Sequence, residues 1–252
     1  MGEPGMIAIL QWGTLVTCTV VLLLRVPDAI RGRNRAVFWI LALATLCSLL
    51  SVTGPYEAID GALGGWNLTH LLLRFLVFAA VLLVGLRVAT GLEDERGYRF
   101  IAGPAGRWAL ALSAVVVAGT FFLMDTRGSS SGLLGIADKG GPNAALAPFY
   151  AAAGRTYPAF VSLALLPALL ATARSQLPRL VRAGALLTCL GALATAFTVP
   201  ASFAPEDWFL AQQTVNYLAV VGYVLGLGLF WASGLVAKKS GNTRATFRKN
   251  ET

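Results

Sequence analysis

Apolar residues along this chain gather into seven long runs, which charged or turn-rich segments separate. The runs cover residues 6–25, 36–53, 67–87, 107–124, 146–173, 180–200 and 211–236. Because a helix needs about 20 apolar residues to cross the hydrocarbon core of a bilayer, each run predicts one transmembrane helix. The expected fold class is all-α, a polytopic bundle of seven helices within residues 1–236, followed by a basic tail over residues 237–252.

The composition favours a membrane-embedded chain over a soluble domain. Hydrophobic residues make up 56 % of the 252 residues and charged residues only 13 %, whereas soluble domains have about 45–50 % and about 25 %. In a soluble protein, a net charge of +8 would suggest nucleic-acid binding, but the chain contains no nucleic-acid-binding motif. We therefore expect the lipid bilayer as its partner, and no nucleic acid.

Charge alternates between successive connections and predicts the side of the membrane that each one faces. Basic clusters follow the first, third, fifth and seventh runs, while no connection after an even-numbered run has a basic excess. Since basic residues concentrate in cytoplasmic loops, the N-terminus is expected outside and the C-terminus in the cytoplasm. No basic residue precedes the first run, so it differs from a signal peptide. The expected location is the bacterial plasma (inner) membrane, as a multi-pass protein.

Arg74 is the residue that membrane insertion explains least. It lies 13 residues before Arg87, which is about 20 Å at ~1.5 Å per residue, within a hydrocarbon core about 30 Å thick. A charge there costs at least about 2.5–3.5 kcal/mol. Three explanations are open. Arg74 could snorkel to the outer headgroups, or it could line a polar cavity that binds an anionic group from outside. It could also lock its helix against the neighbouring helices, either through contacts with backbone carbonyls or through an ion pair with a carboxylate of an outer loop, namely Glu57, Asp60 or Asp125.

Other polar side chains share the outer third of the predicted bundle with Arg74. His70 lies one turn above it on the same helix face, and the inner half of the bundle is nearly free of polar groups. This asymmetry suits an external pocket better than a channel. The candidate ligand-binding residues are His70, Arg74, Arg155, Tyr157, Gln213, Asn216 and Tyr217.

Small residues recur at helical spacing in the last two runs. They include Gly184 and Gly191 in the sixth run and Gly222 and Gly226 in the seventh. Residues without bulk let membrane helices approach closely. The pattern predicts helix packing, either within the bundle or between two copies of the chain.

No catalytic or metal-binding pattern occurs. The chain has one histidine and three scattered cysteines, and it lacks HExxH, GxSxG, a P-loop or an intramembrane aspartate pair. We expect no metal, no cofactor and no catalytic residue. The function that fits is a non-enzymatic receptor- or sensor-like membrane subunit, or a partner-binding one, which contacts other membrane or cytoplasmic proteins through its basic inner loops. The alternatives are a small transporter or permease subunit and an intramembrane enzyme acting on lipid.

Several short segments of the chain resemble segments of a known group of membrane proteins. They are Arg33-Asn-Arg-Ala-Val-Phe-Trp39, the stretch from Asp60 to His70, Tyr150 to Tyr157, and Leu180-Val-Arg-Ala-Gly184. In these the chain is similar to seven-helix integral membrane modules of high-GC actinobacteria, some of which precede a cytoplasmic domain, as do the seven-helix sensor modules of histidine kinases. The resemblance implies a fold and no activity. Because the chain ends soon after the seventh run, no output domain of its own is expected.

Overall fold

A computed structural model of the chain describes residues 3–32, 35–128, 140–204, 208, 214–215, 218–219, 221–230 and 232–234. Regular structure within these residues is helical throughout and includes no strand, which confirms the all-α fold class. The predicted tail over 237–252 lies outside them. The helices are α1 (Glu3–Ile30), α2 (Arg35–Ser51), α3 (Thr53–Ala62), α4 (Leu68–Gly91), α5 (Glu95–Ala102), α6 (Pro104–Leu123), α7 (Pro142–Arg174) and α8 (Arg179–Ala201).

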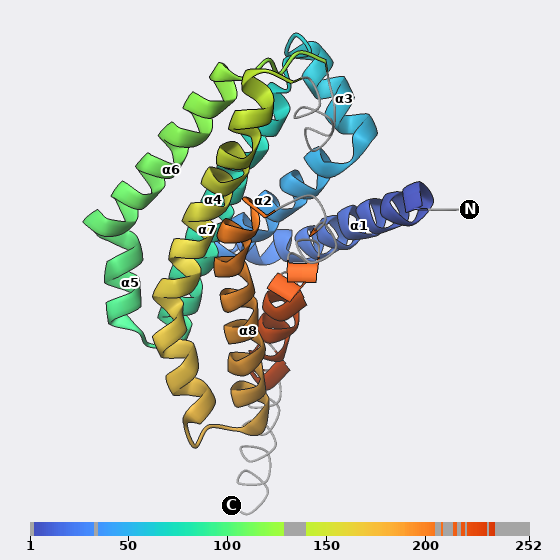
Figure 1. Cartoon of the computed structure of the whole chain (residues 1–252). Coiled ribbons are helices and arrows are strands. Elements are labelled where there is room, and N and C mark those ends of the chain that lie inside the picture. The colour runs from blue at the N-terminus through green and yellow to red at the C-terminus, as the bar shows by residue number, and fades with distance from the viewer. Residues whose placement is uncertain are drawn as a thin grey trace, which may run out of the picture.

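Helices α4, α6, α7 and α8 form an elongated bundle (Figure 1). Near one end of the α4–α7 interface, His70 contacts Tyr150. Further along, a Cβ atom on Gly85 would meet the side chain of Val161. Residue numbers thus rise in the same direction on both helices, so α4 and α7 run parallel.

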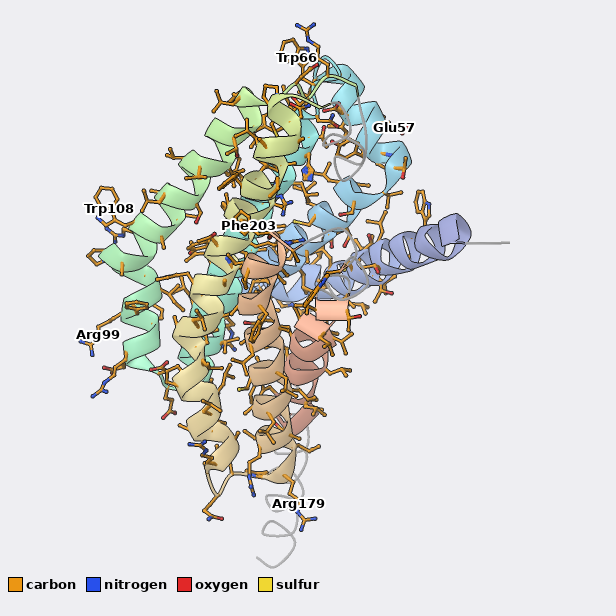
Figure 2. All side chains as sticks on the ribbon, viewed as in Figure 1. Glu57, Trp66, Arg99, Trp108, Arg179 and Phe203 are labelled. Atoms are coloured by element: carbon orange, nitrogen blue, oxygen red, sulfur yellow. The ribbon has the colours of Figure 1, made fainter. Side chains whose placement is uncertain are left out.

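Helix α8 runs antiparallel to α7. At one end Arg155 donates to the Thr198 carbonyl oxygen at 3.2 Å, and at the other Arg182 donates to the Ala173 carbonyl oxygen at 3.1 Å. The upper end of α8, next to Phe203, stops well short of the end where Trp66 and Glu57 lie (Figure 2). The first turns of α7 therefore extend beyond the end of α8.

Glycines bring α8 and the helical segment 221–230 into close contact. A Cβ atom on Gly222 would lie 2.6 Å from the Gly191 Cα, and one on Gly184 would lie 3.0 Å from the Gly226 carbonyl oxygen. The first distance is too short for a real Cβ atom, and the second is shorter than most real Cβ contacts, so the two backbones lie against each other. The four predicted packing glycines thus contact one another within the chain. They are therefore not available for packing between two copies of the chain.

Within the described part of the chain, four helices are long and apolar enough to cross a membrane: α4, α6, α7 and α8. A fifth span results if α2 and α3, which meet at an angle of 87°, are counted as one broken span. Shorter apolar helices cover Trp12–Leu24, within α1, and Val221–Gly234. Helix α1 packs against α2 and lies across the direction of the bundle (Figure 1).

Two connections that the sequence pattern assigns to loops contain helices. Helix α3 occupies the connection after α2, where Val52 is extended (φ −84°, ψ 129°) and breaks the preceding helix. Pro55 falls in the first turn of α3, where a missing N–H costs nothing because no intrahelical acceptor faces it. Helix α5 begins where the Asp94 side chain accepts from the Gly97 N–H at 3.0 Å, an ordinary N-cap. Glu57 and Asp60 are therefore helix residues, not loop residues.

The outward face of α6 is apolar. Trp108, Leu112, Val115 and Phe122 recur at helical spacing and are 60–69 % exposed. A soluble monomer rarely exposes so continuous an apolar surface. This face is compatible with contact with lipid, while the core lies on the other side of α6, between α4 and α7.

Candidate functional site

A group of polar side chains from α4, α7 and the end of α8 meets towards one end of the bundle. We call it the polar cluster and define it as His70, Arg74, Tyr150, Arg155 and Ser202. Three of the predicted ligand-binding residues, His70, Arg74 and Arg155, belong to it. The sequence alone did not point to Tyr150 or Ser202 as members.

Tyr150 joins the two cluster residues of α4. Its hydroxyl lies 3.3 Å from His70 Nδ1, and the Arg74 Cζ atom lies 5.5 Å from the centre of its ring. A guanidinium within about 6 Å of an aromatic ring centre is attracted by the ring's electrons. His70 is only 5 % exposed, so this tyrosine fixes both α4 side chains against α7.

The Arg74 guanidinium packs directly on the backbone of α7 at Gly154. A Cβ atom on Gly154 would lie 2.9 Å from Arg74 Cζ, so any larger residue there would push the guanidinium away. Arg74 Nε is buried and has no hydrogen-bond partner in the structure. An unpaired donor on a charged group is costly to bury. Within the described part of the chain, Arg74 therefore lacks one hydrogen-bond acceptor.

Arg155 follows Gly154 directly and supplies the second positive charge of the cluster. Its Nη1 atom donates to Ser202 Oγ at 2.7 Å and to the Thr198 carbonyl oxygen at 3.2 Å. The two arginines are close enough for their charges to repel each other. Both side chains are half-buried, so each keeps some surface for a further contact.

Asp60 does not lie against Arg74. Its carboxylate is fully buried and accepts from the backbone N–H groups of Asn67, at 3.0 Å, and Thr69, at 3.2 Å. These donors belong to the start of α4, where N–H groups lack intrahelical acceptors and negative charge is favoured. Asp60 is thus a cap of α4, while Glu57 on the same helix is exposed.

Asp125, the third carboxylate proposed for Arg74, also lies elsewhere. Its Oδ1 atom accepts from the Arg127 N–H at 3.2 Å, and its backbone is tied to Asn143 by bonds of 2.8 and 3.0 Å. Among the residues that the structure describes, neither Arg74 nor Arg155 forms an ion pair with a carboxylate. The ion-pair explanation of Arg74 therefore finds no support in any of its three candidates.

Tyr157 belongs to the apolar core next to the cluster. It is fully buried, its ring centre lies 5.6 Å from that of Phe78, and its hydroxyl has no hydrogen-bond partner among the described residues. It is therefore a core residue that leaves one polar atom unmet. The remaining candidates, Gln213, Asn216 and Tyr217, lie outside the described residues.

One open hollow lies at the opposite end of α4, against α5. It is lined by charged side chains of both signs, and the ion pair of its Glu95 and Arg99, at 4.0 Å, is 89 % and 75 % exposed. Exposed pairs of this kind contribute little energy, and the hollow gathers no buried polar group. We regard it as solvated surface, not as a ligand site.

Within the described ranges, no three His, Cys, Asp or Glu side chains gather in a way that could hold a metal ion. The donors of the polar cluster are instead two guanidinium groups, an imidazole and hydroxyls.

Comparison of the chain with protein-family models, with curated proteins and with solved structures finds no match. The site is therefore interpreted from its own geometry.

Proposed function

We propose that the chain is an integral protein of a bacterial plasma membrane, in which the seven apolar runs are spans, with the N-terminus outside and the C-terminus in the cytoplasm. Charge at the two ends of the bundle supports this orientation. Arg87, Arg174 and Arg179 lie at the end where α7 gives way to α8, and Glu57 lies at the other (Figure 2). Basic residues favour the cytoplasmic side, so under this proposal the polar cluster lies in the outer half.

We propose further that the chain is a non-enzymatic, receptor- or sensor-like subunit that holds a ligand at the polar cluster and contacts partner proteins through its basic inner loops. The observation that carries this proposal is the cluster itself. Two helices, α4 and α7, bring His70, Arg74 and Arg155 together, although such groups are expensive inside a membrane and are usually functional there. His70 faces the Tyr150 phenol, which is not the arrangement of a serine or cysteine nucleophile with its base.

The other half of the bundle supports a ligand site over a transport path. Beyond Arg74, the described α4–α7 interface is formed by apolar residues such as Phe78, Val161, Leu165 and Leu169. A transporter needs polar groups near the membrane midplane and access from both sides. A subunit that binds at one face needs neither.

Cysteine labelling in intact cells tests the proposed function. In a chain whose own cysteines are replaced by alanine, we expect Ser202→Cys to react with a membrane-impermeant maleimide from outside. A panel of small acidic, neutral and basic compounds is then added, and we expect one class to slow this reaction by occupying the cluster. Glu57→Cys is the control for the outer side and Arg179→Cys for the inner side, since both positions are exposed.

The outcomes separate topology from function. Labelling of Arg179→Cys in intact cells, with Glu57→Cys protected, would reverse the orientation. A Ser202→Cys thiol that stays unlabelled in intact and in permeabilised cells would mean that the cluster is closed, and would contradict a ligand site there. Labelling that no compound class slows would also count against it.

A further inference from the structure

We propose that the ligand of the polar cluster is an anionic, oxygen-rich group, a phosphate or a carboxylate, bound jointly by Arg74 and Arg155. This inference rests on the proposed function and names the chemical class of its ligand. It is argued from the balance of charge in the cluster, from the direction of its donors and from the surface that both arginines retain.

The charge of the cluster is not balanced by the described protein. Arg74 and Arg155 bring two positive charges to one place, yet the buried candidate carboxylate, Asp60, is engaged with the backbone at the start of α4. Like charges close together destabilise each other, and a charge that is partly withdrawn from water without a counterion is destabilised as well. A bound anion would remove both penalties at once.

The cluster also offers more donors than acceptors. Within the described ranges, Arg74 Nε donates no hydrogen bond, and Arg155 donates through one nitrogen, Nη1, to Ser202 and Thr198. A guanidinium carries five N–H groups in a planar fork that matches the oxygens of carboxylate and phosphate. An amine or another cation would meet two like charges that no carboxylate of the described residues pairs with, so cationic ligands are disfavoured.

The geometry keeps the Arg74 guanidinium in place for such a ligand. The Tyr150 ring lies against it, and Gly154 allows it to sit on the α7 backbone. Arg155 is attached to the next residue of the same helix and is held by the end of α8. Two forks fixed by packing lose little freedom when they bind, which favours affinity.

The anion can come from two sources, an anionic lipid headgroup or a small anion dissolved outside the cell. The full-length chain is reconstituted in nanodiscs, and its thermal unfolding midpoint is measured in two arms. In the first arm, zwitterionic discs are titrated with inorganic phosphate or with succinate against sodium chloride of equal ionic strength. In the second, phosphatidylglycerol replaces part of the zwitterionic lipid without added anion. A rise in the first arm identifies a dissolved anion, and a rise confined to the second identifies a headgroup.

Arginine variants tie the effect to the cluster. Arg74→Ala and Arg155→Ala should each weaken the stabilisation about tenfold in anion concentration, or ~1.4 kcal/mol, while Arg127→Ala, which removes an exposed charge at the same end, should leave it unchanged. Arg74→Lys keeps the charge without the fork and should bind less tightly than the wild type, which provides a readout if the alanine variant fails to fold.

The inference is overturned if neither arm raises the midpoint above the chloride control, or if Arg74→Ala and Arg155→Ala respond as the wild type does. Its failure is distinct from failure of the proposed function. A neutral or basic compound that slows labelling of Ser202→Cys would keep the binding function and refute the anion. If no compound slowed labelling of Ser202→Cys, both the binding function and the anionic ligand would be refuted.

Discussion

Replacing Asp60 with alanine is expected to lower the free energy of unfolding by about 2–6 kcal/mol, because it leaves two buried N–H groups without an acceptor at about 1–3 kcal/mol each. The donors are those of Asn67 and Thr69 at the start of α4. The Asn67 side chain in turn donates to the carbonyl oxygens of Thr126 and Gly128, both at 2.7 Å. Loss of Asp60 should therefore loosen the connection between α4 and the segment after α6 as well.

Unfolding of the purified chain in detergent, followed by circular dichroism, measures this loss. Glu57→Ala is the matched control, since it removes a carboxylate from the same helix at an exposed position and should change stability by less than about 0.5 kcal/mol. Asp60→Asn keeps one acceptor oxygen and should fall between the two. Equal stability of the Asp60→Ala and Glu57→Ala variants would show that the buried carboxylate does not hold the start of α4.

Replacing Gly222 with alanine is expected to destabilise the chain by about 1–3 kcal/mol, the usual range for overpacking a tight interface. The new methyl group would lie 2.6 Å from the Gly191 Cα and 2.9 Å from the Leu187 carbonyl oxygen. Both are backbone atoms of α8, which cannot turn aside as a side chain can. The two helices must then separate and lose contacts along their whole interface.

Gly228→Ala is the matched control for this effect. Gly228 lies in the same helical segment, but a Cβ atom there meets nothing within 4 Å. The same added methyl should leave the unfolding midpoint unchanged or raise it slightly, since alanine favours helix over glycine. If both variants unfold alike, the close approach of Gly191 and Gly222 does not contribute to the stability of the fold.

The long helices could be predicted from the sequence because hydropathy is a property of consecutive residues. Helices α4, α6, α7 and α8 each coincide with an apolar run to within a few residues. The same pattern missed α3 and α5, because both carry charged residues and are too short to form a membrane-length run. The Val52 break and the Asp94 cap that delimit them are local backbone features, which an apolar average does not register.

The candidate site was predictable only in part, for a related reason. A charge inside an apolar run is easily recognised, so the sequence predicts Arg74 as a site residue together with its helix neighbour His70. What surrounds Arg74 is set by α7, about eighty residues further along, where Tyr150 and Gly154 look like ordinary helix residues. The sequence indicates only the side of the membrane on which the three candidate carboxylates lie. It does not indicate that Asp60 accepts instead from the backbone at the start of α4.

The most direct test is an experimental structure of the full chain purified from its native membrane. We expect non-protein density at the polar cluster, in contact with the guanidinium groups of Arg74 and Arg155 between α4, α7 and the end of α8. A cluster filled by protein side chains, in which Arg74 Nε and the remaining N–H groups of both guanidinium groups donate to protein acceptors, would contradict the ligand site and leave the two arginines a structural role.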